Sequence, residues 1–569
     1  MAANWEDNLR QVLIQDKVIS DEQWLHAKET QKENAERLDR VLLRLSMVKE
    51  EQLFHILSEI LHIPYVKLAE EKIDLKTLEK ISAKYAHQNK VVPLRAEEDT
   101  LLIALADPFN IHLQDELRIL VGQNIKICLT SEKDIDEAIH EYYGVGAATM
   151  EEIAQTQGMD ISTNAATIAE LKELEKDAED DEASIIKFMN QLITDAYRDR
   201  ATDIHIEPFE NDLRIRYRID GVMHEIPAPA SIKQFEAAIV SRIKIMAELN
   251  IAEKRLPQDG RIKVKLEGEE IDIRVSTIPT IWGESVDLRI LPRHRVLLGL
   301  EQLGVEEADL NNIEKLIKMP HGIILVTGPT GSGKTTTLYA GLSRINSVDK
   351  MIVTIEDPVE YQLRGINQIQ VKPKIGLTFA EGLRSILRQD PNIIMVGEIR
   401  DPETAEIAIR ASLTGHLVFS TLHTNDAVGA ITRLVDMGIA AYLVSSSVEA
   451  ALAQRLVRKL CPQCREKYMP EAEVLAEFNV KAGDVKNKDI YKASTTGCAE
   501  CTYMGYKGRT GIYELFLIDD SIRRLILERE AVSVIKQKAI TLGMRTLRMD
   551  GWSKILQGLT SIDEVLRVT

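Results

Sequence analysis

The sequence predicts an α/β protein of several domains whose C-terminal part contains a parallel sheet, and three observations support this. The chain has 569 residues and is 44% hydrophobic, enough for about three or four domains. From about residue 310 onward, short apolar runs alternate with amphipathic stretches, which is typical of strands joined by crossover helices. A glycine-rich segment separates the apolar run 323–326 from a helical stretch at 336–342. This placing indicates a phosphate-binding loop between a strand and a helix.

The charge balance argues against nucleic acid as a partner. The chain carries 71 basic and 89 acidic residues, a net charge of −18, which repels a phosphate backbone.

No apolar run approaches the length of about 18 residues that marks a membrane span, and the first residues are too polar for a signal peptide. We therefore expect a cytoplasmic protein.

The N-terminal region, residues 1–143, is predicted to hold a helical repeat followed by a small α/β domain. The helical pattern that begins at Leu9 returns at Leu38, at a constant offset of 29 residues. Residues 91–142 alternate between strand and helix patterns, with Cys128 in an apolar run that predicts a buried thiol. Residues 144–182 are polar and end in an acidic run, so we predict a flexible linker there.

Two further modules follow this linker. Residues 183–292 have alternating strand patterns at 213–219 and 271–275 on either side of a helical stretch, which predicts a second α/β module. Residues 293–569 carry the glycine-rich segment, two CxxC pairs and a set of terminal helices.

The segment from Gly328 to Thr335 matches the pattern GxxxxGK[ST]. Its glycines allow successive backbone N–H groups to converge on phosphate oxygens, and the helix N-terminus adds a positive partial charge. We expect Lys334 to bind the β- and γ-phosphates of ATP and the Thr335 hydroxyl to ligate Mg²⁺. The predicted nucleotide-binding residues are Gly328, Pro329, Thr330, Gly331, Ser332, Gly333, Lys334, Thr335 and Thr336.

Two carboxylates are expected at the same edge of the sheet. Glu398 follows the apolar run 392–396, and Glu360 follows the apolar run 351–355. Because the carboxyl ends of parallel strands meet at one edge, we predict that Glu398 orders Mg²⁺ or the attacking water and that Glu360 is a second catalytic carboxylate. Gly397 stands where many P-loop proteins have an aspartate, so the magnesium role is not assigned to that position.

Two histidines flank the apolar run 417–419, His416 before it and His423 shortly after it. A histidine at a strand end can hydrogen-bond a γ-phosphate or relay its loss, and we predict a catalytic role for both. The alternative is that each is an ordinary surface histidine with its hydrogen bonds satisfied locally.

The order of four motifs resembles the secretion ATPase superfamily, whose members power type II secretion and type IV pili. The motifs are GPTGSGKT at 328–335, TIEDPVEY at 354–361, DPNIIMVGEIRDPETA at 390–405 and TGHLVFSTLHTNDA at 414–427. The resemblance extends upstream through ATDIHIEP at 201–208 and RYRIDG at 216–221.

This resemblance implies a RecA-like C-terminal domain, a PAS-like module before it, and ATP hydrolysis coupled to mechanical work. It also implies a homohexamer that is peripheral to the inner membrane and acts on a platform protein there, with pilus alignment and assembly proteins as further partners. The length and the two-part N-terminal region favour the pilus extension (PilB-like) ATPases over the type II secretion ATPases. A DNA-transfer translocase would need basic stripes with interleaved aromatic residues, and a non-hydrolysing scaffold would not need Lys334 and the acidic residues.

Three arginines in the module before the P-loop domain are predicted to contact the γ-phosphate. Arg218, Arg274 and Arg289 have planar guanidinium groups that suit bidentate phosphate binding. The resemblance suggests that they act on the site of their own chain. The alternative is that they are arginines paired with acidic residues of their own sheet.

The two CxxC pairs predict a structural zinc site. Cys461 and Cys464 lie 37 residues before Cys498 and Cys501 respectively, and four thiolates suit tetrahedral Zn²⁺ and leave no position open for water. A redox disulfide is the alternative. We expect a lobe at about 461–501 that the metal holds at its base.

The helical repeat resembles a domain that binds cyclic di-GMP in some pilus and secretion ATPases, where each half begins Arg-Leu-Gly. The corresponding triplets here are Asn8-Leu9-Arg10 and Arg37-Leu38-Asp39. Both lack the glycine, and Asp39 places negative charge where a phosphate would approach. We therefore expect a docking role and no binding of cyclic di-GMP.

Overall fold

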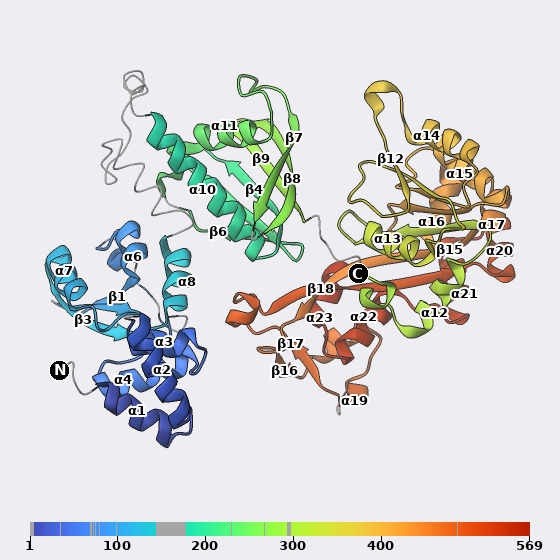
Figure 1. Ribbon diagram of the computed structural model, residues 1–569. Helices are drawn as coiled ribbons and strands as arrows, with labels where there is room; N and C mark the ends of the chain where they lie inside the picture. Colours follow the sequence, from blue (N-terminus) through green and yellow to red (C-terminus); the bar gives the residue numbers. More distant parts are fainter. Residues whose placement is uncertain are drawn as a thin grey trace. The chain divides into compact units, whose positions relative to one another are not determined.

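The computed structural model describes residues 5–569 except 35, 69–70, 72, 74, 79, 98–99, 144–177, 229, 267, 293–297 and 486–487. The chain forms two compact units, Met1–Pro292 and Arg293–Thr569 (Figure 1). Most of the predicted linker, residues 144–177, lies outside the described residues. Its last part is helical, since helix α10 (Ala178–Arg198) begins there. Among the described helices, none has the length and apolar character needed to cross a bilayer.

The N-terminal helices fold as two similar halves. They are α1 (Trp5–Gln15), α2 (Asp21–Asn34), α3 (Leu38–Arg44) and α4 (Glu50–Leu61). Leu9 and its counterpart Leu38 are both fully buried. Lys17 and Ser46, which are also 29 residues apart, both adopt a left-handed conformation, with φ of 53° and 52°. The sequence repeat is therefore also a repeat of backbone conformation.

The small α/β domain contains a three-stranded sheet. Strand β1 (Val91–Glu97) pairs antiparallel with β2 (Thr100–Leu105), which pairs parallel with β3 (Asn124–Leu129). The helices of this domain are α5 (Leu75–Leu78), α6 (Ala83–Asn89), α7 (Ile111–Val121) and α8 (Glu132–Tyr143). Cys128 in β3 is fully buried, and burial raises the pKa of its thiol to about 12. The predicted buried strand thiol is confirmed.

The module that ends the first unit has a six-stranded antiparallel sheet in the order β6-β5-β4-β9-β8-β7. Its elements besides α10 are β4 (Ala201–Pro208), β5 (Leu213–Ile219), β6 (Val222–Ile226), η3 (Ala230–Phe235), α11 (Glu236–Met246), β7 (Gln258–Leu266), β8 (Glu269–Thr280) and β9 (Gly283–Pro292). Ile215 and Tyr217 of β5 are buried and alternate with arginines of the opposite face. One face of the sheet therefore packs in the core, and the other is polar.

The second unit is built on a seven-stranded sheet in the order β12-β11-β13-β14-β10-β15-β18. Its first six strands are parallel, and β18 runs antiparallel to β15. The strands are β10 (Gly322–Thr327), β11 (Ile352–Glu356), β12 (Asn367–Gln370), β13 (Ile393–Val396), β14 (Leu417–Leu422), β15 (Val448–Leu460) and β18 (Tyr506–Leu517). All residues of β10 and β14 are buried, as expected for parallel strands covered on both faces. The predicted parallel sheet is confirmed.

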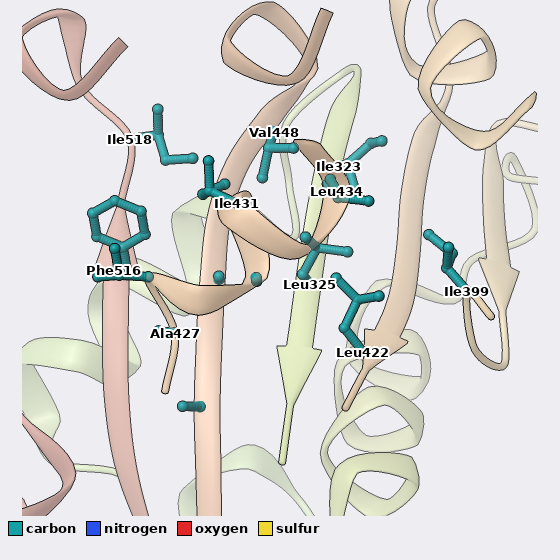
Figure 2. Packing of buried hydrophobic residues seen from close by; sticks show 14 of the residues in the cluster. Ile323, Leu325, Ile399, Leu422, Ala427, Ile431, Leu434, Val448, Phe516 and Ile518 are labelled. Carbon is teal, nitrogen blue, oxygen red and sulfur yellow. The ribbon is translucent and has the colours of Figure 1, made fainter. Parts of the chain in front are cut away.

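Helices cover both faces of this sheet. They are η4 (Leu300–Leu303), α12 (Glu307–Leu316), α13 (Lys334–Ile345), η5 (Pro373–Ile375), α14 (Phe379–Ile386), η6 (Leu387–Gln389), α15 (Pro402–Leu413), α16 (Gly429–Asp436) and α17 (Ala441–Ser447). Figure 2 shows Ala427, just before α16, and Ile431, in its first turn, near Phe516 of β18 and Leu325 of β10. The segment that follows β14 is thus seated on the sheet by apolar packing.

A small lobe and four terminal helices complete the second unit. The lobe lies between β15 and β18 and contains β16 (Glu466–Tyr468), α18 (Ala472–Ala476), α19 (Ala482–Val485), β17 (Ile490–Lys492) and η7 (Ala499–Cys501). The terminal helices are α20 (Asp520–Leu527), α21 (Val532–Thr541), α22 (Leu547–Leu556) and α23 (Ile562–Val568).

A buried carboxylate anchors α23 to the long strand β15. Glu564 is 1% exposed. Its carboxylate accepts hydrogen bonds from the guanidinium of Arg458 at 2.7 Å, from the Arg458 backbone N–H at 3.0 Å and from Arg567 at 2.8 Å. Burial alone would raise the pKa of Glu564, but the bonds from Arg567 and Arg458 outweigh it and lower the pKa from 4.5 to about 2.

We predict that Glu564→Gln destabilises the second unit by about 3 kcal/mol at pH 7, because it leaves the partly buried Arg458 without its charge partner. Since the folded-state pKa is the lower one, the carboxylate stabilises the fold above about pH 4.5, and this contribution is lost as the pH falls toward about 2. Scanning calorimetry across that range should show the parent converging on the variant. Glu528 is exposed, so Glu528→Gln is the control and should have the melting temperature of the parent at every pH. If Glu564→Gln also had the melting temperature of the parent at every pH, Glu564 would not stabilise the second unit as proposed.

Candidate functional site

The glycine-rich loop lies where the sequence places it, between the end of β10 and the start of α13. Gly328 and Gly333 have φ of 148° and 89°. A Cβ on Gly328 would lie 2.6 Å from the carbonyl oxygen of Gln454, and one on Gly333 would lie 2.7 Å from the Gln454 amide nitrogen. Both positions thus need glycine, because the loop turns tightly against strand β15.

Lys334 is the first residue of α13, and its ammonium group is turned onto the loop. Nζ donates to the carbonyl oxygens of Gly328 at 2.8 Å and Pro329 at 3.0 Å. Burial lowers the pKa of Lys334 to about 8; the Glu398 carboxylate opposes this shift, and the positive charge of Arg455 adds to it. The loop therefore holds a partly desolvated cation where a phosphate group would lie.

Glu398 and His423 meet beside this loop. Strand β14 lies between β10 and β13, so the residues that follow β13 and β14 come together at one edge of the sheet. His423 Nε2 lies 3.3 Å from one carboxylate oxygen of Glu398, and Arg400 binds the other oxygen at 2.5 Å. Glu398 is held in a defined orientation, with its side chain 15% exposed.

A tight backbone approach explains the glycine at position 397. A Cβ there would lie 3.3 Å from both the Cα of Glu356 and the carbonyl oxygen of Ile355. An aspartate at this position would crowd the end of β11, so the end of β13 presents its carboxylate one residue later, on Glu398.

The two glutamates at the end of β11 and shortly after it, Glu356 and Glu360, have different surroundings. Glu356 is the last residue of the strand and is 3% exposed. It accepts hydrogen bonds from the hydroxyls of Tyr339 and Thr354, so it ties β11 to α13 and is not a solvated loop residue. Glu360 is half-buried at the carboxyl edge, and its backbone hydrogen-bonds the Tyr339 hydroxyl.

His416 lies at the opposite edge of the sheet from the phosphate loop. Its carbonyl oxygen accepts from the N–H of Gly322, at the amino end of β10, and its Nδ1 is 2.9 Å from the carbonyl oxygen of Ala411. Strand β14 separates it from His423 by roughly 23 Å, at about 3.3 Å per residue. Within one chain, His416 and the phosphate loop therefore lie at opposite edges of the sheet. The catalytic role of His416 stays a prediction.

Arg455 belongs to the site but was not predicted from the sequence. It is 8% exposed, and its guanidinium donates to the carbonyl oxygens of Gln454 at 3.1 Å and Asn425 at 2.8 Å. One of its nitrogens lies 3.1 Å from where a Cβ of Gly328 would be. The sequence signal is weak, because Arg455 is one of two arginines in a mostly apolar strand and belongs to no motif.

The three arginines of the first unit share a face of its sheet with Asp203. Arg218 and Arg289 lie directly across from Asp203 on the two neighbouring strands, and Arg274 lies across from Arg289. Asp203 is 6% exposed and binds Arg289 at 2.9 Å and Arg218 at 3.5 Å. Arg218 and Arg289 thus show the pairing with an acidic residue of their own sheet that was the alternative to phosphate binding. A contact of the three arginines with the γ-phosphate stays a prediction.

The four cysteines converge at the base of the lobe. The sulfur atoms of Cys461 and Cys498, of Cys464 and Cys501, and of Cys498 and Cys501 are 3.7, 3.7 and 3.8 Å apart, and all four lie within 4.8 Å of one another. A disulfide requires about 2.05 Å, whereas a tetrahedron with Zn–S bonds of about 2.3 Å has edges of about 3.8 Å. Backbone N–H groups also donate to the Cys501 sulfur, which favours a thiolate. The donor set fits zinc.

We predict that ATP binding takes up close to one proton per site at pH 9 and almost none at pH 7. Lys334, with a pKa of about 8, is mostly uncharged at pH 9 in the free protein, and the phosphates of ATP should restore its charge. Calorimetry in two buffers of different ionisation enthalpy measures this uptake. Lys334→Arg is the control, since its guanidinium stays charged and should take up no proton. Equal uptake by the parent at both pH values would contradict the assignment.

Protein purified without added metal should contain about one zinc per chain by elemental analysis. Cys464→Ser should lose the metal and lower the melting temperature of the second unit, because the metal joins the ends of β15 and β18. The matched control is Cys128→Ser, which removes a buried cysteine of the first unit and should keep the zinc. A stable, metal-free parent protein would rule out the site.

Comparison with known proteins agrees with this geometry. The family described as "Type II/IV secretion system protein" matches residues 178–567, and the MshEN domain matches residues 61–149. The type IV pilus assembly ATPase PilB of Myxococcus xanthus is 42% identical over 98% of both chains, and the type II secretion system protein E of Xanthomonas campestris is 44% identical over 99% of this chain and 98% of its own. The solved structure of the Legionella pneumophila ATPase DotB shares the fold, with a TM-score of 0.50, 21% identity, and coverage of 67% of this chain and 95% of that one. The chain therefore belongs to the type II/IV secretion ATPase superfamily and hydrolyses ATP.

Proposed function

We propose that this chain is the motor of type IV pilus extension, which couples ATP hydrolysis to the polymerisation of pilin. The observation that carries the hydrolytic part is the pair of Glu398 and His423 beside Lys334. A carboxylate held by a histidine and an arginine at the edge of the phosphate loop is poised to orient a water molecule.

The residues of the second unit divide the chemistry among them. Lys334 gives up its bonds to the loop carbonyls and stabilises charge on the β- and γ-phosphates. Glu398 orients the attacking water, and His423 registers the γ-phosphate and its loss. Thr335 would hold Mg²⁺ together with Glu398, and the metal would neutralise charge on the phosphate oxygens. Glu360 is the second carboxylate at that edge.

Arg218, Arg274 and Arg289 are proposed as a phosphate clamp on the first unit. Asp203 stabilises two of them in an orientation that keeps the guanidinium groups on one face of the sheet. A γ-phosphate that bound them would favour closure of the two units, and its release would favour their separation. This is the route by which hydrolysis could produce movement.

The assembly and location follow from the same proposal. A homohexamer would act on a platform protein of the inner membrane, with pilus alignment and assembly proteins as further partners. The chain would be cytoplasmic and peripheral to that membrane, and zinc would have a structural role at the base of the lobe.

Pilus extension and type II secretion are supported by different relatives. The Myxococcus pilus ATPase matches along nearly the whole chain, including the N-terminal helical repeat. Several type II secretion relatives match about four fifths of this chain. The Xanthomonas type II relative matches the full length as well, so type II secretion is the second candidate.

The N-terminal helical repeat is proposed as a docking domain. Asp39 is 6% exposed and binds Arg37, which also binds Asp107 at 2.7 Å. The arginine of the second triplet thus has its charge matched by two carboxylates, which disfavours a phosphate of cyclic di-GMP at that point.

Substitutions at the phosphate loop test the proposal. Lys334→Ala should lower phosphate release by about 100-fold or more, and Glu398→Gln should lower kcat by about 100-fold with ATP affinity within about threefold of the parent. Glu403→Gln, an exposed carboxylate on α15, is the control and should behave like the parent. Loss of ATP affinity in Glu398→Gln would make that residue structural.

In cells, replacing the gene with its Lys334→Ala variant should abolish the surface pili seen by electron microscopy and leave the secreted proteins unchanged. Loss of the secreted proteins with normal pili would instead identify a secretion motor.

A further inference from the structure

The segment His423–Ala427 leads from β14 toward α16 and lies beside the phosphate loop. The N–H of Gly328 donates to the carbonyl oxygen of Leu422, directly before this segment. His423 reaches Glu398 from its first position. Any shift of the segment therefore moves a residue that touches the catalytic carboxylate.

Three charged side chains from distant parts of the chain hold this segment. Arg455 of β15 donates to the carbonyl oxygen of Asn425 at 2.8 Å. Glu514 of β18 accepts from the N–H of Ala427 at 2.9 Å. Lys536 of α21 donates to the carboxylate of Asp426 at 2.7 Å. The segment is thus fixed from two strands and one terminal helix.

Asp426 uses its two carboxylate oxygens for different bonds. One accepts from the N–H of Gly429 at 2.9 Å, where α16 begins, and the other binds Lys536. Ala427 is fully buried and lies in the apolar cluster of the sheet (Figure 2). The end of the segment is therefore anchored, and Lys536 acts on the part between that anchor and His423.

Lys536 also serves a second carboxylate. Glu514 is 1% exposed, and Lys536 lies 3.7 Å from it. Burial raises the pKa of Glu514, the Ala427 N–H and Lys536 oppose this shift, and the charge of Asp426 adds to it. Two carboxylates thus share one ammonium group, and without it they would repel each other across the segment.

The ion pair between Lys536 and Asp426 affects the conformation of the segment His423–Ala427 more than it affects the stability of the fold. Lys536 is 31% exposed and Asp426 is 28% exposed, and ion pairs with this degree of solvent access contribute about 0–1 kcal/mol to stability. Asp426, however, is three residues from His423, in a segment with little freedom.

We propose that Lys536 is a positioning residue for ATP hydrolysis: by joining Asp426 and Glu514, it keeps the segment His423–Ala427 in the conformation that sets His423 against Glu398. This inference rests on the proposed catalytic roles of Glu398 and His423. It also makes α21 part of the nucleotide site, since a displacement of that helix moves the segment. The terminal helices and the phosphate loop are then coupled in both directions.

The test compares Lys536→Met with Lys538→Met, which removes an exposed lysine from the same helix. Lys536→Met should lower kcat about tenfold, with KM for ATP and the melting temperature close to those of the parent. Lys536→Arg should restore most of the rate, because the positive charge returns. Lys538→Met should hydrolyse ATP at the parent rate.

A double-variant cycle with Asp426→Asn separates positioning from general damage. The double variant Lys536→Met/Asp426→Asn should be no slower than the slower single variant, since both remove the same contact. A parent-like rate in Lys536→Met, or a rate loss that follows a fall in melting temperature and is not rescued by arginine, would overturn the inference. The Lys334→Ala variant separates a failure of the proposed catalytic site from a failure of the positioning role. If Lys334→Ala still hydrolyses ATP, the proposed catalytic site is wrong. If Lys334→Ala is inactive and Lys536→Met hydrolyses ATP at the parent rate, only the positioning role is refuted.

Discussion

The insertion of β14 between β10 and β13 is the constraint on which the nucleotide site depends. Strand order places the phosphate loop, His423 and Glu398 on three neighbouring strand ends. Thr421 of β14 donates to the carbonyl oxygen of Gly397, and Ser420 donates to that of Val396. These bonds fix the two strand ends relative to each other. Because the strands are fully buried, their ends can move little, and the histidine and the carboxylate meet without a flexible loop.

The long pair β15–β18 connects this edge to the rest of the second unit. Near the phosphate loop it carries Arg455 and Glu514, and at its far end the cysteine cluster joins the strands beyond the last pair of the ladder. The two strands are prominent in Figure 1. Since Lys536 of α21 bridges Glu514 and Asp426, a displacement of the terminal helices reaches the catalytic edge through charged contacts as well as apolar packing. A motor needs such paths, because chemistry at one site must change contacts elsewhere.

Much of the fold followed from local pattern in the sequence. The strand at 213–219, the buried Cys128 strand and the 29-residue repeat depend on periodicities that a chain segment carries by itself. The phosphate loop was identifiable because Gly328, Gly333 and Lys334 act within one short segment. The spacing within the cysteine pairs likewise limits how thiolates can be arranged, so the cysteine cluster could be predicted as a candidate metal site without knowledge of the rest of the fold.

Tertiary structure decided which of the remaining polar residues meet. His416 and His423 look equivalent in sequence, but they lie at opposite ends of one strand, and a strand separates its ends by its full length. Glu356 and Glu360 are neighbours in sequence, yet one is buried on Tyr339 and the other is at the open edge. Arg455 and Lys536 have no motif, because their roles come from strand pairing and helix packing over 30 and 110 residues of separation. The sequence alone thus determined the chemistry that short segments contain, whereas the fold determined the contacts that depend on strand order, since strand order is set by packing of the whole chain.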